Sequence, residues 1–190
     1  DWAEDRRPLR RSAPLPDRWV VGTLVALAAV PVVVRYARIR AGRATPHHDV
    51  QGVWRPVAAA VFEGTPLYLA GAVDNKPPLF ELLNLAVYGT GAYLPVFLAL
   101  VALANAAAAI CLWRLFADRE YGLLGAAAAV VFLAALPLVN GTAINVRSFS
   151  VALVLAALAA SRPATRGIAL ASACLVSQYA VFATPVVVAD

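Results

Sequence analysis

The chain is poor in charged residues and contains no methionine. Only 14% of its residues are charged and 62% are hydrophobic, whereas soluble domains are nearer a quarter charged and half apolar. The scarcity of charge excludes an ordinary soluble domain and predicts a membrane protein with several spans. Because methionine is absent even at position 1, we interpret the chain as a fragment that lacks its true start. Because the chain stops just after an apolar run that reaches Val188, we expect its C-terminal remainder to be missing too, so that it forms the N-terminal part of a transmembrane domain.

Cysteine and lysine are also scarce. Cys111 and Cys174 lie far apart in apolar segments without metal-ligand spacing, which predicts buried free thiols. No basic stripe with interleaved aromatic residues occurs, so no nucleic-acid partner is expected. The arginines that give the net charge of +5 are concentrated at the flanks of apolar runs, as is typical of membrane proteins. Lys76 is the only lysine among many arginines. A lysine ammonium is a mobile point charge that suits a phosphate oxygen.

Five apolar runs predict membrane spans at residues 19–34, 93–115, 123–139, 149–160 and 168–188. An arginine-rich cytoplasmic tail is predicted at residues 1–18, and an outer loop with about two interfacial helices at about 35–92. The whole of 19–190 is expected to form part of one transmembrane domain.

The segment 79–91 decides the topology. Its apolar core, Leu79–Val87, is too short to cross a bilayer at about 1.5 Å per residue. Glu81, Asn84 and Tyr88 fall on one helical face, so we predict an amphipathic helix in the interface rather than a span. This choice places 117–121 and 161–167 in the cytoplasm and 140–147 on the same side as the outer loop.

The stretch from Pro46 to Glu81 carries most of the polar chemistry, and it resembles a known superfamily. An acid soon after the first span, Glu-Gly-Thr-Pro-Leu-Tyr at 63–68 and Asp-Asn-Lys-Pro-Pro-Leu at 74–79 carry the resemblance. Together they are similar to the protein O-mannosyltransferase and lipid A aminoarabinose transferase superfamily of C-type (GT-C) glycosyltransferases. The resemblance covers roughly residues 43–136.

The resemblance implies an all-α integral membrane protein with a GT-C-like multi-span helical bundle. It also implies an inverting glycosyltransferase that moves a mannose-like sugar from a polyprenyl- or dolichyl-phosphate carrier to an acceptor hydroxyl. The acceptor would be a protein, glycan or lipid, and the reaction would take place on the outer face of the cell membrane. No cofactor is implied.

Two residues receive the principal roles in this hypothesis. The resemblance implies that Asp49 is the base that deprotonates the acceptor, whereas its position before Gln51–Phe62 also fits a simple helix N-cap. Lys76 matches the lysine that contacts the donor phosphate in the family; its alternative role is to meet lipid headgroups. The prolines at 77 and 78 would hold the ammonium in place.

Further candidates are less specific. Arg147 and Arg55 are supporting candidates for the donor phosphate, although Arg147 also fits a residue that snorkels at the end of a span. Asp74 is a possible second acid or a salt-bridge partner of Lys76. The two adjacent histidines at 47 and 48 cannot easily share one ion, so no metal is expected. The glutamates at 63 and 81 are interpreted as polar faces of interfacial helices.

The chain departs from the family at two places, and two other functions remain open. Tyr93-Leu94-Pro95 stands where many relatives have an arginine, and asparagines at 140 and 145 stand where they have an acid. A polyprenyl-lipid transporter or flippase would need similar cations, and a non-catalytic membrane subunit is the third alternative. A transporter needs no proton acceptor, so the substitution Asp49→Asn distinguishes it from an enzyme.

Overall fold

The computed structural model describes residues 17–69, 72–117 and 121–189, and in these ranges every regular element is a helix. The elements are α1 (Asp17–Arg40), the π-helix η1 (Val50–Trp54), α2 (Arg55–Phe62), α3 (Pro78–Gly89), α4 (Tyr93–Ala117), α5 (Gly122–Ala135), α6 (Val146–Ala159), α7 (Pro163–Val176), the 3₁₀ helix η2 (Gln178–Ala183) and α8 (Thr184–Ala189). The prediction of an all-α fold is confirmed for the described residues.

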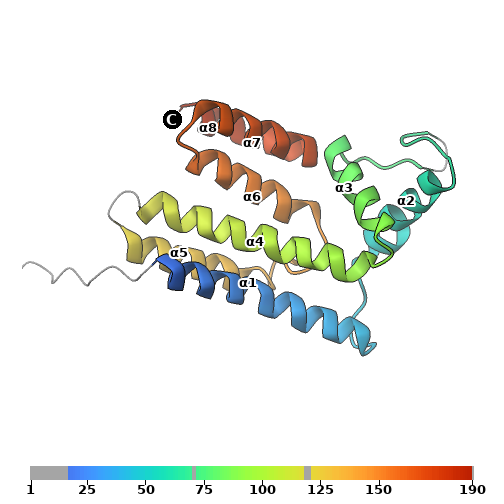
Figure 1. Cartoon of the computed structure of the whole chain (residues 1–190), viewed down its shortest axis with the longest axis horizontal. Coiled ribbons are helices and arrows are strands. Elements are labelled where there is room, and N and C mark those ends of the chain that lie inside the picture. The colour runs from blue at the N-terminus through green and yellow to red at the C-terminus, as the bar shows by residue number, and fades with distance from the viewer. Residues whose placement is uncertain (1–16, 70–71, 118–120, 190) are drawn as a thin grey trace, which may run out of the picture.

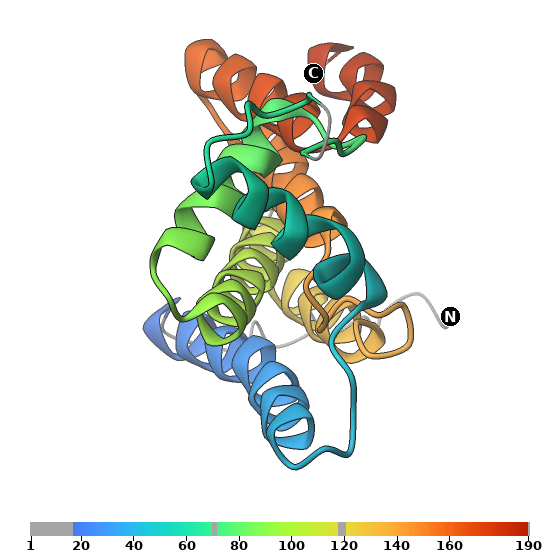
Figure 2. The same cartoon turned by 90° about the vertical axis from the view of Figure 1, so that its right-hand side faces the viewer.

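Helix α4 lies at the centre of a bundle (Figure 1). It packs against α1, α5 and α6, and α6 in turn packs against α7. These helices lie side by side, while α2 and α3 lie across one end of the bundle, as the two views show (Figures 1 and 2). The segment that was predicted as the outer loop therefore covers one end of the helices.

Two apolar clusters hold this arrangement together. At the covered end, Trp54 of η1 and Phe80 of α3 meet Phe97 of α4, with the Trp54 and Phe80 ring centroids 4.9 Å apart. Deeper in the bundle, small residues allow close helix packing. A Cβ at Gly125 of α5 would lie 2.6 Å from the Trp113 carbonyl oxygen of α4. The α4–α5 contact therefore requires glycine at this position.

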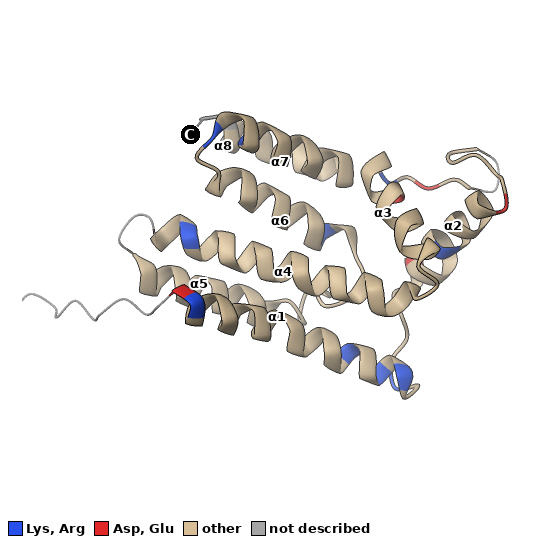
Figure 3. Cartoon of the chain, in the orientation of Figure 1, with Lys and Arg blue, Asp and Glu red and all other residues tan. Residues whose placement is uncertain are grey.

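Two helices, α1 with 24 residues and α4 with 25, are long and apolar enough to cross a membrane. The apolar helices α5, α6 and α7 have 14 residues each, which is about 21 Å at 1.5 Å per residue. Large apolar side chains are exposed on the outer helices, including Val33 of α1, Val131 of α5 and Ile168 of α7. Charged residues gather at the two ends of the bundle and leave its middle uncharged (Figure 3).

Several helices have boundaries that differ from those of the predicted spans. The first helix runs to Arg40 rather than stopping at residue 34, so its flanking arginines lie on the helix itself. The helix at the segment predicted as 123–139 ends at Ala135, because Pro137 has no N–H to donate for a further helical turn. The helix predicted at 149–160 begins earlier, at Val146, because Asn145 caps it. Residues 1–16 of the tail predicted at 1–18, and residues 118–120 of the predicted turn, lie outside the described residues. The last two residues of that predicted tail, Asp17 and Arg18, belong to α1.

The span predicted at 168–188 is also wrong, because the chain forms a hairpin there. α7 starts at Pro163, which is favourable at a first helical position, and ends at Val176. Ser177 is extended (φ −148°, ψ 121°), and η2 and α8 then return along α7. The Arg166 guanidinium donates to the Val187 carbonyl at 3.5 Å across the hairpin. Serine and proline are unfavourable in helix interiors, and Ser177 and Pro185 interrupt this run.

The helix predicted at 79–91 is present as α3, but its polar face points the opposite way from the expected one. Glu81 and Asn84 are fully buried against η1 and α4, while Leu82 is 58% exposed. The interpretation of Glu81 as part of a solvated face is therefore wrong. Polar groups that are buried must find partners, and Asn84 finds them in Trp54 and Tyr93. An apolar outer face suits a helix in contact with lipid.

Candidate functional site

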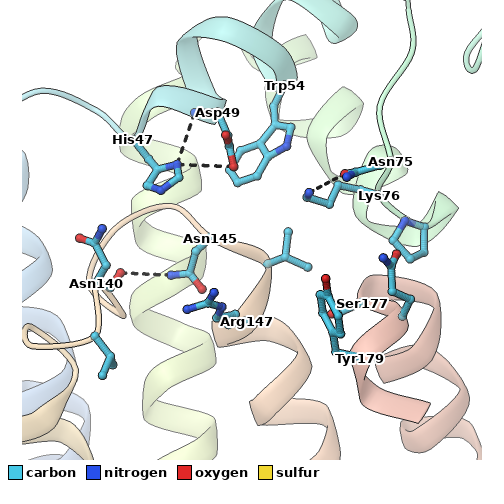
Figure 4. A pocket seen from close by; sticks show the side chains of 14 residues that line it. His47, Asp49, Trp54, Asn75, Lys76, Asn140, Asn145, Arg147, Ser177 and Tyr179 are labelled. Atoms are coloured by element: carbon cyan, nitrogen blue, oxygen red, sulfur yellow. Dashed lines mark hydrogen bonds and ion pairs between the residues drawn. The ribbon is translucent and has the colours of Figure 1, made fainter. Parts of the chain in front are cut away.

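A polar cavity of about 320 Å³ lies where the loop and α3 meet the bundle (Figure 4). Segments far apart in the sequence line it: the start of η1, the loop before α3, the α5–α6 loop with the start of α6, and the α7–η2 hairpin. The lining residues include His47, Asp49, Trp54, Asn75, Lys76, Asn140, Asn145, Arg147, Ser177 and Tyr179. The prediction that 140–147 lies on the same side as the outer loop is confirmed.

Asp49 directs its carboxylate toward two histidines rather than toward the helix that follows it. Its backbone occupies the N-cap position of η1, but its side chain makes no capping bond, so the capping alternative is wrong. One oxygen lies 2.8 Å from His48 Nε2, and the other lies 3.6 Å from His47 Nδ1. The Asp49 carboxylate is 29% exposed, whereas the His48 side chain that contacts it is 85% exposed. Asp49 is thus partly desolvated and points into the cavity.

His47 is the neutral partner in this group. Burial lowers the pKa of His47, and this effect outweighs the opposing charge of Asp49. The Nδ1 atom of His47 accepts the Asp49 backbone N–H at 3.3 Å, which is possible only when that nitrogen carries no proton. The imidazole stands over the indole ring of Trp54 with the two centroids 6.3 Å apart.

Lys76 reaches the same cavity from the loop before α3. Its Nζ donates to the Asn75 side-chain oxygen at 2.6 Å, and its carbonyl oxygen accepts the Tyr68 hydroxyl at 2.9 Å. Pro77 is extended and Pro78 begins α3, so the backbone on the C-terminal side of Lys76 is rigid. In the described part of the chain, no carboxylate forms a salt bridge with Lys76. The alternative that made Asp74 its partner is therefore wrong.

Arg147 lies in the first turn of α6, and asparagines fix the loop before it. Asn145 caps the helix, since its side-chain oxygen accepts the Ser148 backbone N–H at 2.9 Å. Asn105 of α4 is buried and donates to the Gly141 carbonyl at 2.8 Å. The Asn145 side chain also donates to the Ala143 carbonyl at 2.7 Å, a bond that an ionised acid at this position could not make. The N-terminal end of α6, with its partial positive charge, therefore faces the cavity together with Arg147.

An apolar groove of about 730 Å³ continues from the polar cavity. Arg147, Ser177 and Tyr179 line both spaces, so the two are contiguous. The groove is otherwise lined by side chains from α4, α5, α6 and η2: Leu112, Phe132, Ser150, Val151, Val154, Leu155, Ala180 and Ala183. Ser177 and Tyr179 were not among the predicted site residues, although the polar run Ser-Gln-Tyr inside an apolar segment was a signal for them.

Two predicted site residues do not reach the cavity. Arg55 follows the buried Trp54 on the helix, and one helical step turns its side chain by about 100° toward the exterior. The prediction that Arg55 contacts the same phosphate as Lys76 is therefore not supported by its position. Asp74 is half-buried beside Glu81 of α3 rather than in the cavity.

One group in the described residues has the composition of a metal site. Ligand atoms of His47, His48 and Asp49 lie within 4.8 Å of one another. Two imidazoles and a carboxylate are ligands that zinc accepts in proteins. The cations of Lys76 and Arg147 line the same cavity, however, and they favour an anion there.

The chain matches no protein-family model, no curated protein and no solved structure. The geometry of the site combines a carboxylate, an ammonium and a guanidinium at the mouth of an apolar groove.

Proposed function

We propose that this chain is part of a GT-C-like membrane glycosyltransferase that uses a sugar linked to polyprenyl or dolichyl phosphate. The observation that carries the proposal is the continuity of a cationic cavity with an apolar groove through Arg147, Ser177 and Tyr179. A lipid-phosphate sugar has the same two parts: a charged headgroup and a long apolar chain. The headgroup would bind in the cavity and the first isoprene units in the groove.

Lys76, Arg147 and the N-terminal end of α6 would bind the phosphate. When the glycosidic bond breaks, the lipid phosphodiester becomes a phosphate monoester with an additional negative charge. Cations that are already in place stabilise this developing charge more than they stabilise the ground state. The rigid backbone around Lys76 and the capped start of α6 keep both charges in position.

Asp49 would act as the general base. It accepts the proton of the acceptor hydroxyl while that oxygen attacks the anomeric carbon, and the lipid phosphate leaves from the opposite face, so the configuration inverts. A partly buried carboxylate suits this role because it retains little hydration. His48 would orient the carboxylate through its 2.8 Å contact. The proposed chemistry uses no metal ion or organic cofactor.

The exposed apolar belt and the charged ends of the bundle favour a multi-span domain in the cell membrane. We place the cavity on the outer face and the start of α1 in the cytoplasm, because Arg114, Arg162 and Arg166 then lie on the cytoplasmic side. The shorter helices α5, α6 and α7 would cross with their ends snorkelling or in a locally thinned bilayer.

Substitution of Lys76 tests the proposal, with Arg55 as the control. The variant Lys76→Ala removes a charged hydrogen bond of about 1.5–3 kcal/mol, so binding of radiolabelled polyprenyl phosphate should weaken about 10- to 150-fold. Arg55→Ala removes a cation nearby but outside the cavity, so it should leave the affinity unchanged. Equal effects of the two substitutions would reduce the role of Lys76 to general surface charge and contradict the proposal.

The same pair of spaces would also serve a polyprenyl-lipid transporter, which is the alternative function. A transporter requires the headgroup cavity and the groove but no proton acceptor. Wild-type lipid translocation by an Asp49→Asn variant, without sugar transfer by the wild-type protein, would favour it. Absence of both activities, together with absence of lipid binding, would indicate a non-catalytic membrane subunit.

A further inference from the structure

Glu81, the one charged residue of α3, is buried and lacks a hydrogen-bond partner for one of its oxygens within the described part of the chain. Glu81 is 0% exposed, and its Oε2 accepts a hydrogen bond from Asn84 at 3.2 Å, while its Oε1 has no partner in the described structure. Asn84 also donates to the Trp54 carbonyl at 2.8 Å and accepts from the Tyr93 hydroxyl at 2.6 Å. A buried carboxylate with an unpaired oxygen is strongly unfavourable.

A second carboxyl group with the same deficiency lies next to it. Asp74 comes from the loop before α3 and lies within hydrogen-bonding reach of Glu81. Its Oδ1 accepts the Asn75 backbone N–H at 2.6 Å, while its Oδ2 is buried without a partner among the residues that the structure describes. Two ionised carboxylates in contact would repel each other and leave both oxygens unpaired. One proton placed between them turns one group into a donor and satisfies both.

We propose that Asp74 and Glu81 share one proton, and that this proton fastens the loop carrying Lys76 to α3. The hydrogen bond would join Oε1 of Glu81 to Oδ2 of Asp74, the two oxygens that otherwise lack partners. Because Asp74 precedes Lys76 by two residues, the pair sets the position of the ammonium from outside the cavity. Both carboxyl groups are thus positioning residues rather than catalytic ones.

The electrostatic surroundings support a proton at this place. Burial, followed by the hydrogen bond to Asp74, raises the pKa of Glu81 to about 8. Lys76 acts in the opposite direction but is too weak to reverse the shift. The other titratable groups that face the pair are the hydroxyls of Tyr68 and Tyr93, and burial together with the charges of the two acids raises the pKa of Tyr68. The charge of Arg55 acts on the Tyr93 hydroxyl, which lies next to the pair.

The shared proton makes the loop sensitive to pH. A raised pKa in the folded state means that the folded protein holds a proton that the unfolded chain releases above its ordinary pKa of 4.5. Stability therefore falls as pH rises from about 4.5 to about 8 and becomes level above that. Above about 8 the two carboxylates repel each other, and the loop separates from α3. The consequence for lipid binding rests on the proposed function of Lys76.

Infrared spectroscopy on the wild-type protein in detergent or lipid, without any ligand, tests the shared proton directly. At pH 7 the wild-type protein should show the carbonyl band of a protonated carboxylic acid, and the band should disappear as pH rises through about 8. Glu81→Gln and Asp74→Asn should each abolish the band. Glu63→Gln, a change at an exposed glutamate, should leave it unchanged. A wild-type spectrum without the band at pH 7 would overturn the proposal.

Unfolding provides a second readout. In the pH range between 4.5 and about 8, unfolding of the wild-type protein should release about one proton more than unfolding of Glu81→Gln does. The glutamine amide donates to Asp74 at every pH, so this variant should show a flatter dependence of stability on pH. The same proton release in Glu81→Gln and in the wild-type protein would contradict the assignment.

Binding of polyprenyl phosphate separates this inference from the proposed function. Wild-type affinity should fall as pH rises through about 8, whereas Glu81→Gln should keep the affinity that the wild-type protein has at pH 7. If the band is present but no polyprenyl phosphate binds at any pH, the shared proton stands and the proposed function fails. If the lipid binds but the band is absent, the proposed function stands and the shared proton fails.

Discussion

Asn84 offers a sharp test of how α3 is held against the bundle. The substitution Asn84→Leu keeps the size of the side chain but removes its contacts with Glu81, Trp54 and Tyr93. The Tyr93 hydroxyl and one Glu81 oxygen then lose their partners in a buried region. At about 1–3 kcal/mol for each unsatisfied group, with relaxation limiting the total, the free energy of unfolding should fall by about 2–4 kcal/mol.

The assay is reversible unfolding in mixed detergent micelles, with the Tyr93→Phe substitution completing a double-mutant cycle. Tyr93→Phe removes only the hydroxyl that donates to Asn84 at 2.6 Å, so it should cost about 1 kcal/mol. The double variant should be less destabilised than the sum of the single variants, because both remove the same bond. Additive effects, or an Asn84→Leu variant as stable as the wild type, would refute the buried network.

Two further predictions concern helix packing and topology. Gly125→Ala should destabilise the protein by about 1–3 kcal/mol, since its Cβ would meet the Trp113 carbonyl oxygen at 2.6 Å, whereas Gly122→Ala has open space and should be neutral in the same unfolding assay. In a variant without Cys111 and Cys174, Glu63→Cys should react with a membrane-impermeant thiol reagent from outside intact cells, and Arg162→Cys should react only after the cells are opened. Labelling of both from the same side would contradict the proposed orientation.

Hydrophobic periodicity and length were sufficient to predict which segments are helical, although not where several of the helices begin and end. The helix after Pro77-Pro78 and the common side of 140–147 and the outer loop followed from such patterns. Periodicity groups Glu81 with Asn84 on one face, but it does not specify whether that face meets water or protein. The structure places the face inside because partners come from η1 and α4, which are distant in the sequence.

The candidate site was predictable where it depended on residue type and not where it depended on a change of chain direction. Asp49, Lys76 and Arg147, which were candidates because of their residue type and position, line one cavity. The hairpin at Ser177 was not predicted, because an apolar run of 21 residues fits one long helix as well as two short ones. The groove beside Arg147 exists only because the hairpin returns there and brings Tyr179 to its edge.

In the proposed reaction the Asp49 carboxylate takes a proton from the acceptor over a bound lipid phosphate, and the Asp49→Asn variant tests this step. The amide cannot accept the proton, so transfer from a labelled polyprenyl-phosphate sugar in the full-length protein should fall by about 100-fold or more. Binding of polyprenyl phosphate should persist, because Lys76 and Arg147 are unchanged. Sugar transfer by Asp49→Asn at the wild-type rate would contradict the account.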